Sequence, residues 1–209
     1  QVNHLPSILP DNIFYVPLNW PLQKFKSPDA GYNYNFKNGN TISATLFHRA
    51  RKDKIERLRV PYHSSVTLDS MANVGNDYSS GIELAANLQF NKYWNLDANT
   101  SYYFYRIKNQ FKIDDDEESW NWQLSVNNNF DVAKNTRVRL EAYYVGPMVS
   151  TQGRVDGFFY LNIAARQQFP KQKLTASLVV RDILSTAEYI NTRSGIGMET
   201  LTKIYPCSP

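Results

Sequence analysis

The chain has 209 residues, of which 42% are hydrophobic, 20% charged and 14% aromatic, and its formal net charge is +4. The charge excess is small and no tight basic cluster is interleaved with aromatic residues, which argues against a nucleic-acid-binding protein. No run of about 18 apolar residues predicts a transmembrane helix. The single cysteine, Cys207, excludes an internal disulfide and a zinc cage.

The first regular pattern predicts a β-hairpin. Aromatic and polar residues alternate at 32–36, and apolar and polar residues alternate at 42–46. Between these runs lies Asn38-Gly39, a pair that favours a tight turn because both residues tolerate a positive φ.

The longest alternating patterns follow in the middle of the chain. Apolar residues alternate there with Asn, Gln, Ser, Thr and Arg over six runs, at 82–90, 94–104, 120–129, 137–144, 159–166 and 174–181. Several runs reach about 10 residues, whereas strands of soluble proteins are commonly about 5–6 residues long. A tilted strand that crosses a membrane needs about 9–11 residues, so these runs predict membrane-spanning strands.

Short connections alternate with long ones. Each of four short links follows a phenylalanine, and this row predicts an aromatic girdle at one membrane interface: Phe36, Phe90, Phe130 and Phe169. The other connections are long and polar, at 49–77, 108–119, 146–157 and 182–197. Short turns on one side and long loops on the other are typical of outer-membrane barrels.

These patterns predict an all-β fold, namely an antiparallel transmembrane β-barrel segment that supplies about eight to ten strands of a larger barrel. The 209 residues are interpreted as a single partial barrel domain. Within it, 1–29 is poorly defined, 30–183 holds the regular strands and 184–209 is irregular. The prolines near the C-terminus oppose a closing strand, which suggests an end that is truncated after about Gly197.

The polar side of the strands carries the first candidate ligand-binding residues, Arg137, Arg139, Glu141, Arg166 and Arg181. If this side lines a lumen, these charges could steer an anionic solute or contact a plug. Pairing with one another across neighbouring strands is the favoured interpretation.

A second candidate is the acidic run in the connection 108–119, formed by Asp114, Asp115, Asp116, Glu117 and Glu118. It could bind a cation, but it lacks the spacing of an EF-hand loop, so a solvated loop is favoured. His4, His48 and His63 are scattered without partners at ligand spacing. No catalytic residues, metal ligands or cofactor site are therefore predicted, and the protein is not expected to be an enzyme.

Several stretches resemble one known family. They are 73–76 leading into 78–84, Trp94-Asn95-Leu96, Trp120-Asn121-Trp122, 151–154, 157–162 and 180–186. Together these stretches are similar in order and spacing to the C-terminal barrel portion of TonB-dependent outer-membrane receptors, in the outer-membrane protein β-barrel family. The likeness covers most of residues 30–195.

The resemblance implies a receptor in the cell outer membrane that takes up a scarce nutrient, with the barrel as pore wall and the long loops capturing solute. Its implied partners are outer-membrane lipid, a plug domain, the remaining barrel strands and the energy-coupling TonB complex. Neither the plug nor the box that binds the coupling protein is found in these residues, and a family barrel has about 22 strands.

Two alternatives stay open. One is an outer-membrane barrel without a plug, acting as a porin, adhesin or enzyme. The other is a soluble, aromatic-rich β protein that binds sugar, against which the strand length argues. The sequence does not distinguish a siderophore, vitamin B12, an oligosaccharide or a peptide as the transported substrate.

Overall fold

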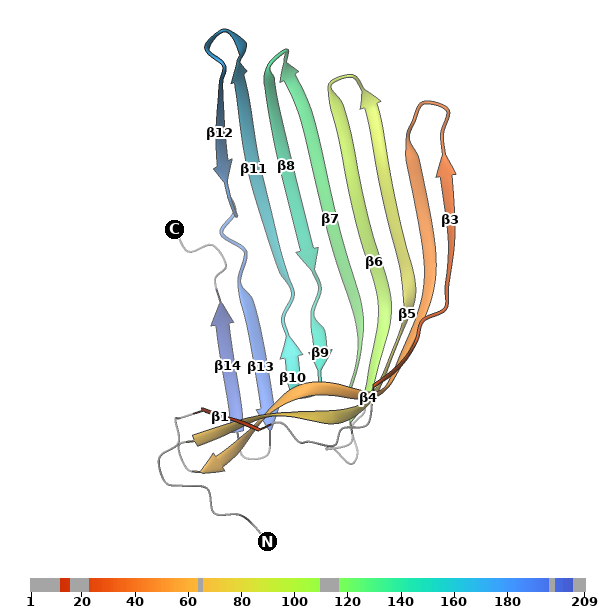
Figure 1. Ribbon diagram of the computed structural model, residues 1–209, viewed down its shortest axis with the longest axis vertical. Helices are drawn as coiled ribbons and strands as arrows, with labels where there is room; N and C mark the ends of the chain where they lie inside the picture. Colours follow the sequence, from red (N-terminus) through yellow and green to blue (C-terminus); the bar gives the residue numbers. More distant parts are fainter. Residues whose placement is uncertain (1–11, 16–22, 64–65, 110–116, 196–197, 205–209) are drawn as a thin grey trace.

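The computed structural model describes residues 12–15, 23–63, 66–109, 117–195 and 198–204, and the fold is all-β (Figure 1). Ten strands form one sheet: β1 (Asn12–Tyr15), β2 (Lys24–Lys26), β3 (Asp29–Asn35), β4 (Thr41–His63), β5 (Val66–Asn91), β6 (Trp94–Asn109), β7 (Glu117–Ala133), β8 (Thr136–Val145), β11 (Phe158–Phe169) and β12 (Leu174–Val180). None of the described residues forms a helix that is long and apolar enough to cross a membrane.

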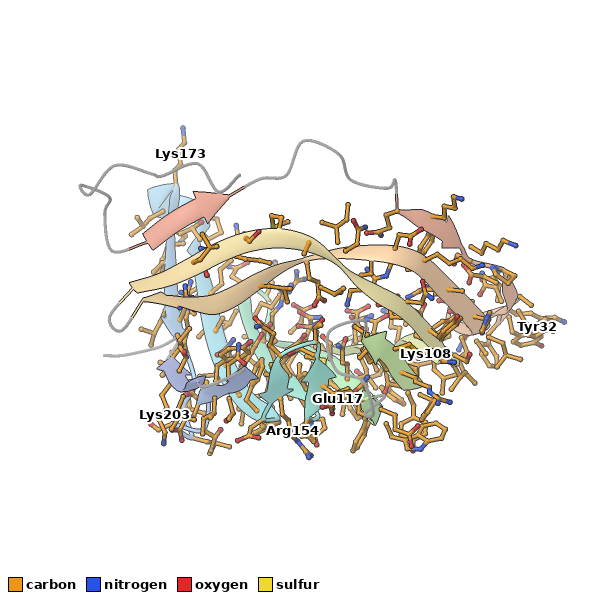
Figure 2. The ribbon with its side chains drawn as sticks, turned by 90° about the horizontal axis from the view of Figure 1, so that it is seen from below. Tyr32, Lys108, Glu117, Arg154, Lys173 and Lys203 are labelled. Carbon is orange, nitrogen blue, oxygen red and sulfur yellow. The ribbon has the colours of Figure 1, made fainter. Side chains whose placement is uncertain are left out.

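The large sheet is an antiparallel meander in the order β12-β11-β8-β7-β6-β5-β4-β2, with β3 also paired to β4. The prediction of an antiparallel segment of about eight to ten strands is confirmed by the ten strands that the described residues place in this sheet. Among the strands that the structure describes, only β1 is parallel to its partner, and it pairs with β5 at Asn12↔Thr67 to Tyr15↔Ser70. The sheet is curved into a trough (Figure 2).

A second sheet continues the first beyond the ends of β8, β11 and β12. It has the order β14-β13-β10-β9, formed by β9 (Met148–Ser150), β10 (Gly153–Val155), β13 (Tyr189–Gly195) and β14 (Met198–Ile204). The stretch 184–209, expected to be irregular, therefore holds two paired strands among its described residues. The connection 146–157 likewise holds a short β9–β10 hairpin.

The largest difference from the sequence prediction concerns the connection 49–77. It was expected to be a long loop, and this was wrong, because β4 and β5 continue through it as one long hairpin up to His63 and Val66. We call residues 54–63 and 66–75 the distal hairpin. In Figure 1 it bends away from the sheet and runs across the end opposite the tight turns.

Two β-bulges cause this bend and reverse the alternation of side chains. The pairing shifts between Arg51 and Lys54, where Asp53 has φ 54°, and again beside Gly75, where φ is 133°. On the tight-turn side of the bulges, odd-numbered residues such as Arg51 lie on the polar face. On the other side of the bulges, the even-numbered residues Leu58 and Val74 are the buried ones. One extra residue on each strand therefore exchanges the two faces of the hairpin.

The sheet is a single layer with little conventional core. Buried Leu58, Val74 and Ile107 form one small cluster at the base of the distal hairpin, joined by partly buried Ala72 and Tyr105. Across the rest of the sheet the apolar face is open. Its large exposed side chains include Tyr32, Leu46, Leu84, Tyr102, Trp120, Trp122 and Leu178, and Tyr32 points away from the trough in Figure 2.

Candidate functional site

The polar face of the sheet is hollowed next to the distal hairpin. A cavity of about 510 Å3 lies there, lined by Phe25, Phe47, Arg49, Arg51, Asp77, Ser79, Glu83, Ser101, Tyr103, Tyr105 and Gln123. A second cavity of about 320 Å3 continues along the polar face and shares Glu83, Ser101 and Gln123 with the first. These residues come together because alternate positions of β4, β5, β6 and β7 face the same side.

Ion pairs between β4 and β5 line the first cavity. Arg49 donates to Glu83 across 3.0 Å, and both side chains are about two-fifths exposed, at 41% and 43%. Arg51 forms a two-pronged pair with Asp77, with Nε 2.8 Å from Oδ1 and Nη2 bonded to Oδ2. Arg51 and Asp77 are directly paired positions of the two strands, whereas Arg49 reaches Glu83 diagonally, so the cavity wall carries opposite charges side by side.

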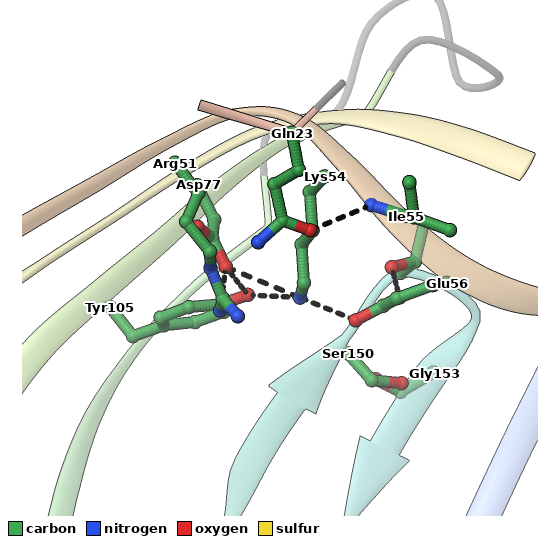
Figure 3. A network of polar contacts seen from close by, with 10 residues as sticks. Gln23, Arg51, Lys54, Ile55, Glu56, Asp77, Tyr105, Ser150 and Gly153 are labelled. Carbon is green, nitrogen blue, oxygen red and sulfur yellow. Dashed lines mark hydrogen bonds and ion pairs between the residues drawn. The ribbon is translucent and has the colours of Figure 1, made fainter. Parts of the chain in front are cut away.

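Asp77 is the centre of a larger polar network (Figure 3). The Tyr105 hydroxyl donates to Asp77 Oδ2 at 2.9 Å and accepts from Lys54 Nζ at 2.9 Å. Lys54 Nζ also lies 3.2 Å from Asp77 Oδ2 and forms an ion pair with Glu56. Lys54 and Asp77 are both buried, and these contacts provide the partners that buried charges need.

Beyond the network, the distal hairpin is tied to the β9–β10 turn. The Thr151 hydroxyl donates to Glu56 Oε2, and Thr151 is buried. The Gln152 amide accepts a hydrogen bond from the Arg59 backbone N–H at 3.0 Å and donates to the Arg59 carbonyl at 2.9 Å. The two segments are more than 90 residues apart in the sequence, so the hairpin is fixed by long-range contacts.

The opposite face of the distal hairpin carries Asp69, whose side chain is only 3% exposed. Arg59 donates to both of its oxygens at 2.8 Å, and Arg57 lies 2.5 Å from Oδ2. Hydrogen bonds from Arg59, which outweigh the opposing effect of burial, and from Arg57 lower the pKa of Asp69 to about 2. The carboxyl is therefore ionised throughout the neutral range.

Of the predicted arginine cluster, Arg137, Arg139 and Arg166 lie toward the tight-turn end of the same polar face, and the partners of the paired arginines lie outside the cluster. Arg137 forms an ion pair with Asp131 at 2.7 Å, and Arg139 donates to Asn129 at 2.9 Å, in both cases across β7 and β8. Arg137 and Arg166 occupy directly paired positions of β8 and β11. Within the described residues, Glu141, Arg166 and Arg181 form no ion pair.

The acidic run is described only in part. Asp114, Asp115 and Asp116 lie outside the described residues. Glu117 and Glu118 begin β7, where they pair with Ile107 and Arg106 of β6. The favoured interpretation of this run as a solvated loop, and the alternative of a cation site, thus stay predictions.

The phenylalanine row falls at one end of the sheet. Phe36, Phe90, Phe130 and Phe169 all lie beside the tight turns, at the top of Figure 1. Trp94 joins this row, stacking on Phe90 at 4.2 Å and on Phe130 at 5.9 Å between ring centroids. A second aromatic group lies further along β6 and β7, where Tyr102 and Trp120 stack at 5.1 Å.

Among the described residues, no group of three or more His, Cys, Asp or Glu side chains is arranged to hold a metal ion. His48 lies within β4, and its Nδ1 is 2.7 Å from the Ser80 hydroxyl. His63 ends β4, and His4 lies outside the described part of the chain.

Sequence reasoning missed the residues of the main cavity and its network. Arg51, Lys54, Glu56 and Asp77 all fell in a stretch that was expected to be a loop. Little signal was present, because Arg51-Lys52-Asp53-Lys54 is a run of four charged residues that resembles a polar loop. The bulge at Asp53 lies within this run, so no strand alternation passes through it.

The chain is similar to one protein family and to one solved structure. The outer membrane protein beta-barrel family matches residues 23–204. A solved structure titled "Structure of the FpvAI-pyocin S2 complex" matches with a TM-score of 0.55 and 16% sequence identity, over 79% of this chain and 23% of that chain. The sheet thus resembles part of a TonB-dependent receptor barrel and spans about a quarter of the matched chain. No curated protein matches.

Proposed function

This chain belongs to the outer membrane protein β-barrel family, and on that premise we propose that it forms part of the wall of a TonB-dependent receptor that takes up a nutrient. Membership of the family implies that the protein resides in the outer membrane. In the proposal, the polar face lines the lumen, and the distal hairpin with the β9–β10 turn forms part of the external surface that captures solute.

The observation that carries the proposal is the contrast between the two faces of one sheet layer. Leu46 and Trp120 on the apolar face are 62% and 60% exposed and have no second layer over them. Soluble monomers rarely leave so large an apolar surface uncovered, whereas lipid covers such a surface in a barrel. The neighbouring polar positions line cavities, as expected of a lumen wall.

The ends of the strands support an orientation for this wall. Tight turns lie at one end of the sheet and the distal hairpin at the other. In outer-membrane barrels, short turns face the periplasm and long loops face outside. The row that includes Phe36 and Phe90 would then be the periplasmic girdle, and the row with Tyr102 and Trp120 the external one.

Cysteine labelling tests the two faces. Leu46 and Thr45 are neighbours in β4, and Thr45 lines the second cavity. In the full-length protein with Cys207→Ser, Thr45→Cys should react with a water-soluble maleimide and Leu46→Cys should resist it. A lipid-phase spin-label quencher should reach a fluorophore at Leu46→Cys only. Equal labelling of both cysteines by the water-soluble reagent would reject the membrane wall.

Conductance separates a receptor from a porin. Purified full-length protein in a planar bilayer should give no steady open channel, because a receptor lumen is closed by its plug. Stable open conductance in the unmodified protein would instead support a plug-less barrel.

A further inference from the structure

The cavity of about 510 Å3 has a volume within the range of about 300–1,000 Å3 that small-molecule sites commonly show. It is lined by residues of five strands, from Phe25 on β2 to Gln123 on β7. Its site is distinct from the arginine cluster near the tight turns, and the chemistry of its walls indicates the class of ligand that it accepts.

The charges in the wall are already matched with one another. Arg49 is paired with Glu83, and Arg51 with Asp77. Both Asp77 oxygens accept from Arg51, and one also accepts from Tyr105. An anionic ligand would have to compete with a carboxylate for each guanidinium, and a cationic ligand with a guanidinium for each carboxylate. The cavity therefore favours a neutral ligand.

The walls are nevertheless rich in hydrogen-bonding groups. Arg49 and Glu83 remain two-fifths exposed, so their outer N–H groups and oxygen atoms can bond to a ligand without breaking the pair. Gln123 offers a side-chain donor and acceptor, and Ser79 and Ser101 add hydroxyls. A purely apolar ligand would leave these groups unsatisfied, which is costly in a closed site.

Aromatic rings complete the lining. Phe25 is 58% exposed, and Tyr103 is half-buried at the cavity wall. Phe47 is not available to a ligand, because it is buried and Arg49 lies over its ring at 4.3 Å. Aromatic rings that are exposed or half-buried beside paired polar groups suit a molecule that has C–H surfaces and hydroxyl groups together.

We propose that this cavity binds a neutral oligosaccharide of about two or three sugar rings, with Phe25 and Tyr103 contacting ring faces and Arg49, Glu83 and Gln123 bonding to hydroxyls. The proposal rests on the proposed function, because it requires the polar face to be an accessible lumen. It specifies the solute class of the cavity, which the fold and the family leave open.

Calorimetry on the full-length protein in detergent tests the proposal. The probes are the neutral trisaccharides maltotriose, cellotriose, xylotriose, mannotriose and laminaritriose, with anionic trigalacturonate and ferric citrate as charged probes. At least one neutral trisaccharide should bind, and both charged probes should bind at least tenfold more weakly. The sugar proposal would be overturned if a charged probe bound more tightly than every neutral trisaccharide, or if no probe bound.

Variants locate the site. Gln123→Ala and Tyr103→Ala should each weaken trisaccharide binding by about tenfold, whereas Gln168→Ala at the tight-turn end should leave it unchanged. Equal effects of Gln123→Ala and Gln168→Ala would contradict the assigned cavity. Glu83→Gln should raise trigalacturonate affinity by freeing Arg49, and an unchanged affinity would contradict the charge-matching argument.

Heat-modifiable gel mobility of each purified variant shows whether the barrel is intact. A shifting band together with no binding of neutral sugars rejects the sugar site and leaves the receptor proposal in place. If the wild-type protein itself lacks a shifting band, the membrane barrel fails first, and the receptor proposal fails with it.

Discussion

The side chain of Gln152 bonds to both backbone groups of Arg59, with its oxygen 3.0 Å from the N–H and its amide nitrogen 2.9 Å from the carbonyl. An amide side chain thus occupies the open edge of β4 much as a neighbouring strand would. Edge backbone groups that lack partners are a liability, and this contact satisfies two of them while fixing the distal hairpin to the β9–β10 turn.

Replacing Gln152 by Ala should loosen the distal hairpin without unfolding the sheet. Two hydrogen bonds of this kind contribute about 1–2 kcal/mol together, so exchange of the Arg59 amide proton should accelerate by about fivefold to thirtyfold. Hydrogen exchange with mass spectrometry measures this change, and Gln168→Ala serves as the control. Unchanged exchange at Arg59 would show that the contact does not hold the hairpin.

Acidification should destabilise the distal hairpin on the face that carries Asp69. The lowered pKa of Asp69, about 2 against an ordinary 3.8, means that its ion pairs contribute stability above pH 3.8. That contribution is lost progressively as the pH falls from about 4 toward 2. Pepsin cleavage within 54–75, normalised to an unstructured peptide at each pH, should rise over this window.

The matched variant is Asp69→Asn, which removes the titrating carboxyl. Its hairpin should be cleaved readily at pH 4, and the normalised cleavage should vary little between pH 4 and pH 2. A wild-type pH response that persists in Asp69→Asn would assign the effect to another group.

Gly81 should tolerate no side chain. A Cβ atom there would lie 2.3 Å from both the Tyr102 carbonyl oxygen and the Tyr103 Cβ, so the backbones of β5 and β6 would have to separate. Gly81→Ala should therefore abolish the heat-modifiable band of the full-length protein. Gly39→Asn is the control and should keep the band, because open space surrounds this turn residue and Asn adopts a positive φ at a smaller cost than other non-glycine residues.

An arginine should be tolerated on one face of β5 and not on the other. The Leu84 side chain is exposed on the apolar face, whereas Ala85 alternates with it and pairs with Ser43 of the polar face. In lipid vesicles, Leu84→Arg should lower the free energy of unfolding by about 2–4 kcal/mol. Ala85→Arg should lower it by less than about 1 kcal/mol, since its guanidinium reaches the polar face. Urea titration followed by tryptophan fluorescence measures both, and equal losses would contradict a lipid-facing Leu84.

The sequence predicted the regular part of the sheet because each strand there obeys one uninterrupted period of two. The alternation at 94–104 and 120–129, for instance, matches β6 and β7 paired from Trp94↔Phe130 onward. The turns were equally predictable, since Asn38-Gly39 allows little else. Strand alternation and turn type are both determined by residues that are close together in the sequence.

The distal hairpin and the main cavity could not be predicted in the same way. The bulges at Asp53 and Gly75 change the phase of the alternation, so a strand looked like a polar loop. The contacts of Asp77 with Arg51 and Tyr105 depend on the register of β4, β5 and β6, which places these three residues next to one another. That register depends on pairing across the sheet, as does the pairing of β13 with β10.

The paired bulges have a consequence for how this protein can change over evolutionary time. The bulges at Asp53 and Gly75 exchange the two faces of the hairpin. The side of the hairpin that a residue of 54–74 faces is therefore independent of the alternation in the rest of β4 and β5. A single-residue insertion within 54–74 would reorder the hairpin surface and leave the register of the wall intact. In the proposed orientation, the hairpin surface can thus diversify while the barrel wall keeps its sequence constraints.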